Sequence, residues 1–265
     1  MYNLIWADLF KLQKSTVVKV MFGITTISAL AMAIIAYLIP QGTLDGSMIG
    51  IGFMFSDINV ISILGAVIAG VYICGDFDNK TIHDAIAIGN SRAFVIISKT
   101  IVFSSTLGFI LLPYVIITGL GLSTGYVFSM GSVAIGFLHM LTSTDPTTVL
   151  VSGIGKILAV MLTLMIVYVA QLSICVPLAF VLKKPVPVVA IYYGLSILSG
   201  QLMVLSAKYP VFNRFFASTP YGGNHVFVTL DTGIGDILGT IAVSLLFIVI
   251  MIAVTYILFR KSEIK

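Results

Sequence analysis

Apolar residues gather in six long runs along the chain, and short polar stretches separate them. A helix of about 20 apolar residues crosses the hydrocarbon core of a bilayer, which is about 30 Å thick. Because backbone groups inside lipid must be hydrogen-bonded, we expect each run to be a helix. The pattern predicts an all-α, polytopic membrane protein, with one transmembrane domain over 1–265 and six transmembrane helices at about 18–39, 57–75, 94–122, 155–182, 186–206 and 236–259.

The third and fourth runs are the longest, and each contains a proline. Pro113 and Pro177 each remove a backbone donor and crowd the preceding turn. We therefore expect kinks at these two positions. The first run begins only after Lys19 and is followed by no small-residue cleavage pattern, so we expect a retained helix and no cleaved signal peptide.

Composition gives the same result as the hydrophobic pattern. Of 265 residues, 59% are hydrophobic and only 9% are charged, whereas a soluble domain carries about 25% charged residues. So few charges could not cover a water-facing surface. The polar stretches are also too short to form a nucleotide-binding or receptor domain.

The distribution of basic residues predicts an orientation. If the N-terminus is cytoplasmic, 11 of the 14 lysine and arginine residues face the cytoplasm, and only Lys156, Lys208 and Arg214 lie outside. The positive-inside rule favours this arrangement, and an even number of spans then places both termini in the cytoplasm. The net positive charge thus reflects membrane topology, and we expect no nucleic-acid partner.

Three segments outside the spans are also apolar. Tyr2, Ile5, Trp6, Leu9 and Leu12 recur at helical spacing, which predicts an amphipathic helix over 1–15 at the membrane interface. The alternative is a cytoplasmic extension of the first span. We expect a short helix over 133–141, lying on the membrane or dipping into it. The aromatic stretch 209–230 is either an interfacial or re-entrant element or an aromatic belt with no further function.

The sequence shows no set of residues that would form a catalytic site within the membrane. Intramembrane enzymes need a nucleophile, a base or metal ligands at membrane depth, and we identify no catalytic or metal site. Asp57 begins the second span, where helix capping accounts for it. Leu150 stands where a phosphate-binding loop ending at Gly155-Lys156 would need its first glycine, which argues against ATP binding by this chain.

The fourth and fifth spans contain neutral polar residues, of which we single out four: Thr163, Tyr168, Gln171 and Gln201. Such residues usually form hydrogen bonds between helices. The alternative is that they line a modestly polar path for a substrate.

The loop between the second and third spans has the most informative pattern. It predicts a short helix over 79–88, a break at Gly89 and an N-cap at Ser91. Ile82, Ala85, Ile86 and Ile88 would face the membrane or a partner, while Asp78, His83 and Asp84 would face the cytoplasm. Such a helix between two spans is suited to transmit force.

The residues of this loop resemble those of ABC-2 type permeases, the membrane subunits of ATP-binding-cassette exporters. Many members have an acidic-aromatic pair, Gly-Thr or a variant, a short helix, Gly-x-Ser-Arg and a later lysine. This chain has Asp76-Phe77, Lys80-Thr81, Gly89-x-Ser91-Arg92 and Lys99 in that order, with Lys80 in place of the commoner glycine. The six spans, N-terminal helix and apolar outer loop are also similar to the family's architecture.

The resemblance implies a coupling helix that docks on a cytoplasmic ABC ATPase, with these contributing residues: Asp76, Phe77, Lys80, Thr81, His83, Asp84 and Arg92. It also implies a bacterial plasma-membrane location, a second permease copy or sibling, contact with membrane lipids, and ATP and Mg on the ATPase with no cofactor on this chain. Short stand-alone permeases of this kind resemble those exporting antimicrobial or amphipathic peptides, including phenol-soluble modulin toxins, or giving immunity to them.

Other functions are compatible with parts of this pattern. One is an ABC-type immunity or sensing complex with little net transport, and another is an ATP-independent transporter. The latter needs buried ionisable groups, and we expect almost none away from the ends of the spans. A membrane-embedded enzyme lacks a catalytic constellation.

Overall fold

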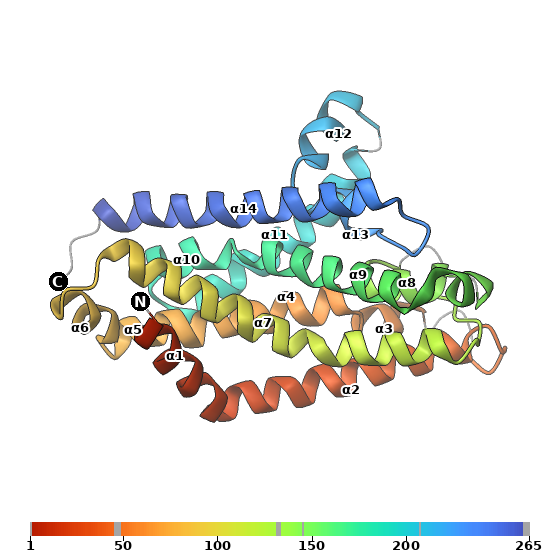
Figure 1. Ribbon diagram of the computed structural model, residues 1–265, viewed down its shortest axis with the longest axis horizontal. Coiled ribbons are helices and arrows are strands. Elements are labelled where there is room, and N and C mark those ends of the chain that lie inside the picture. The colour runs from red at the N-terminus through yellow and green to blue at the C-terminus, as the bar shows by residue number, and fades with distance from the viewer. Residues whose placement is uncertain (1, 45–48, 131–133, 145, 207, 262–265) are drawn as a thin grey trace.

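The protein is a bundle of helices. A computed structural model describes residues 2–44, 49–130, 134–144, 146–206 and 208–261, and every regular element in these ranges is helical (Figure 1). Six helical segments in the described ranges are long and apolar enough to cross a membrane, which confirms the predicted multi-pass architecture. They are Thr16–Leu38, Ile49–Asp78, Arg92–Ser123, Gly153–Leu182, Pro185–Ser206 and Ile234–Arg260.

The spans are built from long helices and shorter pieces. The helices, in chain order, are α1 (Tyr2–Lys14), α2 (Thr16–Leu38), α3 (Ile49–Met54), α4 (Asp57–Ala69), α5 (Gly75–Asp78), α6 (Thr81–Ala87), α7 (Arg92–Ser123), α8 (Gly136–Ser143), α9 (Pro146–Leu172), α10 (Cys175–Leu182), α11 (Pro185–Ser206), α12 (Pro210–Ala217), α13 (Gly223–Val226) and α14 (Ile234–Lys261). A π-helical turn, Gly70–Cys74, joins α4 to α5.

The two ends of the bundle carry different elements. α1, α5, α6 and the C-terminal end of α14 lie at one end, and α3 and α8 lie at the other (Figure 1). The short helix expected over 133–141 corresponds to α8, although position 133 lies outside the described residues. The aromatic stretch 209–230 contains α12 and α13, and α12 projects away from the bundle.

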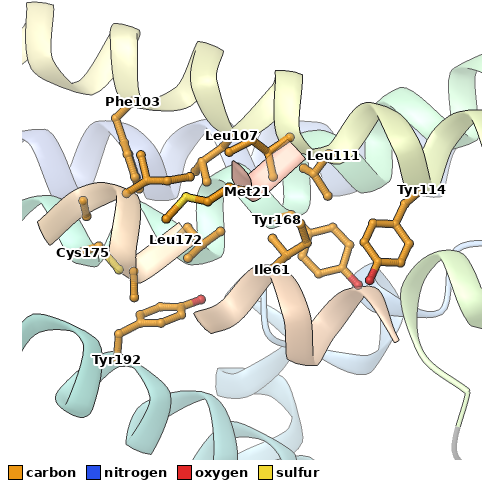
Figure 2. Packing of buried hydrophobic residues seen from close by; sticks show 14 of the residues in the cluster. Met21, Ile61, Phe103, Leu107, Leu111, Tyr114, Tyr168, Leu172, Cys175 and Tyr192 are labelled. Carbon is orange, nitrogen blue, oxygen red and sulfur yellow. The ribbon is translucent and has the colours of Figure 1, made fainter. Parts of the chain in front are cut away.

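α7 forms the centre of the bundle, because it packs against α1, α2, α8, α9 and α14. Its buried side chains include Phe103, Leu107 and Tyr114, which face residues of α4 and α9 (Figure 2). Pro113 lies inside α7, which continues as one helix through it. Pro177 follows the two turn residues that separate α9 from α10, as expected for a proline near an interruption.

α11 is the least enclosed of the six spans. Its described contacts are mainly with α4, α10, α12 and the π-helical turn. Only Val188, Tyr192 and Ser206 are buried, whereas large apolar residues such as Leu198 and Val204 are exposed. An apolar helix with this exposure needs lipid or another protein around it.

Candidate functional site

The loop between the second and third spans is a compact helical corner. α5 and α6 follow the π-helical turn, and Gly89 then adopts a φ of 104° before α7 begins. The Ser91 side chain accepts a hydrogen bond from the Phe94 amide over 3.3 Å, which confirms the predicted N-cap. α6 spans Thr81–Ala87 and is shorter than the predicted helix 79–88.

A buried network of charges joins this corner to α1 and α7. The Lys99 ammonium donates to Asp76 Oδ2 over 2.5 Å and to Asp8 Oδ2 over 2.8 Å. Lys11 donates to Asp76 Oδ1 over 2.6 Å, and the Tyr72 hydroxyl donates to Asp8 over 2.9 Å. Asp8, Asp76 and Lys99 are buried, so the opposite charges satisfy one another away from solvent.

The sequence pattern identified Asp76 and Lys99 but not their partners in α1. Asp8 and Lys11 lie outside the apolar stripe of the predicted helix 1–15, and the structure directs both toward the charged residues of the bundle. Trp6 of the apolar stripe is exposed, whereas Leu12 of the same stripe is buried. The charges of Asp8 and Lys11, close to the start of the first span, were the sequence signal that could have identified these partners. Charged side chains close to membrane depth need oppositely charged partners.

The turn between α5 and α6 depends on an unusual backbone conformation. Lys80 has a φ of 58° and a ψ of 10°, in the left-handed region that favours glycine. The following residue, Thr81, donates its hydroxyl to the Asp76 carbonyl over 3.1 Å. The lysine thus adopts the backbone shape that glycine would adopt more easily.

An aromatic cluster anchors the same corner to α10 and α14. The Phe77 ring lies 5.4 Å from Phe180 and 6.1 Å from Phe259, centre to centre, and both contacts are edge-on. Arg92 donates to the carbonyls of Phe259 and Arg260 over 2.9 and 3.0 Å. A cation there suits the negative end of the α14 dipole.

Burial separates the expected partner-contacting residues into two groups. Asp76 and Phe77 are buried and make internal contacts, and Arg92 is partly buried against α14. His83 is also partly buried, and its ring lies 6.3 Å from that of Phe77. The residues whose side chains are exposed are Lys80, Thr81 and Asp84.

The apolar side of α6 is directed differently from our expectation. Ile82 and Ala85 are buried within this chain, so the prediction that they face the membrane or a partner is wrong. They pack against the core because α6 folds back on α7. Ile88 is 83% exposed and remains available to a partner.

A second feature is a cavity of about 380 Å³ between α4, α9, α11 and α13. It brings together Gln171 and Gln201, two of the four neutral polar residues identified in the sequence. Asn59, Ser196 and Tyr221 add further polar groups, and among the described residues no Asp, Glu, Lys or Arg side chain lines the cavity. A cavity with neutral polar groups and apolar walls suits an uncharged or amphipathic surface.

Thr163 and Tyr168 do not line this cavity. The Thr163 hydroxyl donates to the Ala159 carbonyl of its own helix over 2.7 Å. The Tyr168 hydroxyl donates to Asp57 Oδ2 over 2.5 Å, and the Phe137 amide donates to the same oxygen over 2.7 Å. Figure 2 shows the hydroxyls of Tyr168 and Tyr114 directed to the same region beside α4.

Asp57 is therefore more than a helix-capping residue, which corrects our interpretation. Its side chain is buried and joins α4 to α8 and α9. Ser56 occupies the N-cap of α4 and makes no capping hydrogen bond through its side chain. Asp8, Asp57, Asp76 and Lys99 are all buried ionisable residues. Asp8 belongs to α1, outside the spans, and Asp76 lies at the end of a span, so these two agree with our expectation that ionisable residues are rare away from the span ends.

Hydrogen bonds fasten the segment between α11 and α14 over the cavity. The Gln171 amide donates to the Pro220 carbonyl over 2.8 Å, and the Tyr221 hydroxyl donates to the Gln171 carbonyl over 2.8 Å. His225 is buried between Thr240 of α14 and the Ala217 carbonyl. The loop is thus packed onto the spans, and its polar groups are satisfied there.

Comparisons with known proteins add no relative to these observations. Neither a scan against protein-family models nor searches of curated proteins and of solved structures find a match to this chain.

Proposed function

We propose that this chain is the permease subunit of an ATP-binding-cassette exporter of the ABC-2 type. In this proposal both termini are cytoplasmic, α1 lies at the inner membrane interface, and α6 is the coupling helix of a separate ATPase. The motif resemblance over 76–99 suggested this function. The anchoring of α5, which directly precedes α6, to four other elements is the structural observation that supports it most strongly.

Force applied to α6 would reach the bundle by two routes. One passes from Asp76 to Lys99 of α7 and to Lys11 of α1. The other passes from Phe77 to Phe180 of α10 and Phe259 of α14. Because packed and ion-paired contacts are stiff, movement of the ATPase would shift several spans together.

The contact surface for the ATPase would consist of the exposed residues around α6, namely Lys80, Thr81, Asp84 and Ile88. Asp76, Phe77 and Arg92 would position this surface from inside. ATP and Mg would bind the partner chain, and this subunit would supply the path.

The cavity between α4 and α11 would form part of that path, with Gln171 and Gln201 on its wall. Its neutral lining supports an amphipathic cargo, and we assign a peptide as the substrate class. The exposed apolar side of α11 would face a second permease copy or a sibling subunit, which would close the path on its open side.

Affinity purification of the tagged chain from native membranes tests the proposal. A soluble ATPase should accompany the wild type, and Asp84→Lys or Ile88→Asp should reduce its recovery at least tenfold. Both side chains are exposed, so the melting temperature of the chain should change little. The matched control is Asp231→Lys, because Asp231 is also an exposed acidic residue but lies far along the chain from α5 and α6. Recovery of no ATPase, or equal recovery with both α6 variants, would show that the proposal is wrong.

Buried Asp57 supports a second candidate, an ATP-independent transporter driven by an ion gradient. Transporters of that kind use carboxyl groups within the bundle, and Asp57 has a relative exposure of 0%. Vesicles that contain only this chain distinguish the two functions. Gradient-driven flux that Asp57→Asn abolishes would favour the second candidate.

A further inference from the structure

A surface groove of about 440 Å³ lies on the opposite side of α1 from the charge network. α1 supplies Trp6, Phe10 and Gln13 among its lining residues, α2 supplies Lys19, and α7 supplies Phe109. Trp6, Phe10 and Phe109 are about half exposed or more, so they form a rim. Leu12, Val18 and Thr106 are buried and form the floor.

The walls of this groove suit a hydrocarbon chain. The hydroxyls of Ser105 and Thr106 donate to the Ile101 and Val102 carbonyls of their own helix, over 2.9 and 2.8 Å. Their hydrogen-bonding capacity is thus used within α7, and they present mainly carbon to the groove. The volume lies within the range of about 300–1,000 Å³ that is typical of ligand sites.

The polar edge of the groove carries the positive charge of Lys19. Lys19 lines the groove and makes no ion pair with the described residues. The carboxylates of Asp8 and Asp76 already pair with Lys99 and Lys11. Lys14 lies over the Phe10 ring, 5.7 Å from its centre, and is absent from the lining.

We propose that this groove binds one anionic phospholipid. An acyl chain lies between α1 and α7 against the apolar floor, and the phosphate group binds Lys19, with Gln13 beside it. A charge-assisted hydrogen bond from lysine to phosphate accounts for the preference for an anionic headgroup. The lipid then holds α1 to α7 on one side, as the Asp8–Lys99 pair does on the other.

Trp6 is the only tryptophan of the protein and lines the groove, so its fluorescence reports on the occupant. The full chain is reconstituted in phosphatidylcholine vesicles that contain small fractions of brominated phosphatidylglycerol or brominated phosphatidylcholine. Bromine quenches an indole that it contacts. We expect the anionic lipid to associate about fivefold more strongly, the preference that one lysine provides near a membrane surface.

Three variants distinguish lipid binding in the groove from a general attraction of anionic lipid to the basic residues of the protein. Lys19→Gln should remove the anionic preference, while Lys14→Gln, at a neighbouring lysine outside the lining, should retain it. Ser105→Phe should fill the groove and reduce quenching by both lipids. Equal quenching by the two lipids, equal losses in the two lysine variants, or no effect of Ser105→Phe would each overturn the proposal. Association with an ATPase is measured in a separate experiment. A negative result in the lipid-binding experiment therefore does not contradict the proposed permease function.

Discussion

Lys99 Nζ lies 2.5 Å from Asp76 Oδ2, and both side chains are buried. The two residues are 23 positions apart and belong to different elements, α7 and α5. Asp8 of α1 shares the same ammonium group over 2.8 Å. A buried pair of this kind does not by itself stabilise a fold, but it determines which elements must lie together.

The charge balance of this network predicts unequal effects of its variants. Lys99→Met leaves Asp76 with Lys11, whose side chain is 52% exposed. It leaves Asp8 with the neutral Tyr72 hydroxyl and no cation among the described residues. A buried carboxylate without a partner is costly, so we expect a loss of about 3–5 kcal/mol in the free energy of unfolding. Lys11→Gln should cost less than about 1 kcal/mol, as for an exposed ion pair. Thermal unfolding in detergent measures both.

A double variant checks that this loss arises from the unpaired charge. Lys99→Met combined with Asp8→Asn removes one charge of each sign and leaves the pair of Lys11 and Asp76 in place. The double variant should be more stable than Lys99→Met alone, because the two changes are coupled. Strictly additive losses would show that the charges act independently.

Lys80 should tolerate glycine better than alanine. Its left-handed backbone, with a φ of 58°, costs a residue with a side chain about 1–2 kcal/mol. Lys80→Gly relieves this cost and should raise the melting temperature, whereas Lys80→Ala removes the charge but keeps the strain. The alanine variant therefore serves as the matched control, and equal melting temperatures for the two variants would contradict the strain.

The sequence predicted the spans well because their signal is simple. Each span needs enough consecutive apolar residues to cross lipid, and this number can be counted directly. The N-cap at Ser91 and the break at Gly89 also follow from local chemistry, since a serine side chain and a flexible glycine act on neighbouring residues. Features determined within one or two turns were thus predictable.

Tertiary pairing was not predictable from the same pattern. Asp57 has the position of a helix-starting residue, yet its partners, Tyr168 and Phe137, are 111 and 80 residues away. Ile82 is buried because α6 packs against α7. The spacing of apolar residues in α6 does not reveal this packing. Which apolar side meets protein and which meets lipid depends on neighbours that a single sequence does not specify.

Gly136 should be harder to replace than Gly125. Its φ is 64°, and an added Cβ would overlap the Tyr168 hydroxyl and the Asp57 carboxylate. Gly125 has a similar φ of 70° with no atom within 4 Å of the added Cβ, so Gly125→Ala isolates the backbone strain. We expect Gly125→Ala to cost about 1–2 kcal/mol and Gly136→Ala clearly more. Similar melting temperatures for the two variants would contradict the close packing of α8.

Acidification should weaken the end of the bundle that carries α8, through His139. This residue lies in α8, outside the six spans, with Ser143 Oγ 2.9 Å from Nδ1 and the Phe227 ring 4.9 Å away. Burial lowers the pKa of His139 below its ordinary value of 6.5. The folded chain therefore binds this proton less readily than the unfolded chain, so the contribution of His139 to stability is full above pH 6.5 and is lost as the pH falls toward the folded pKa.

Melting temperatures measured between about pH 7 and pH 5, where histidine titrates, check this sign. The wild type should lose more stability over this range than His139→Gln, which cannot be protonated there. His83 and His225 are present in both proteins, so the comparison isolates the contribution of His139. Parallel melting curves for the two proteins would mean that His139 takes up its proton as easily in the folded chain as in the unfolded one.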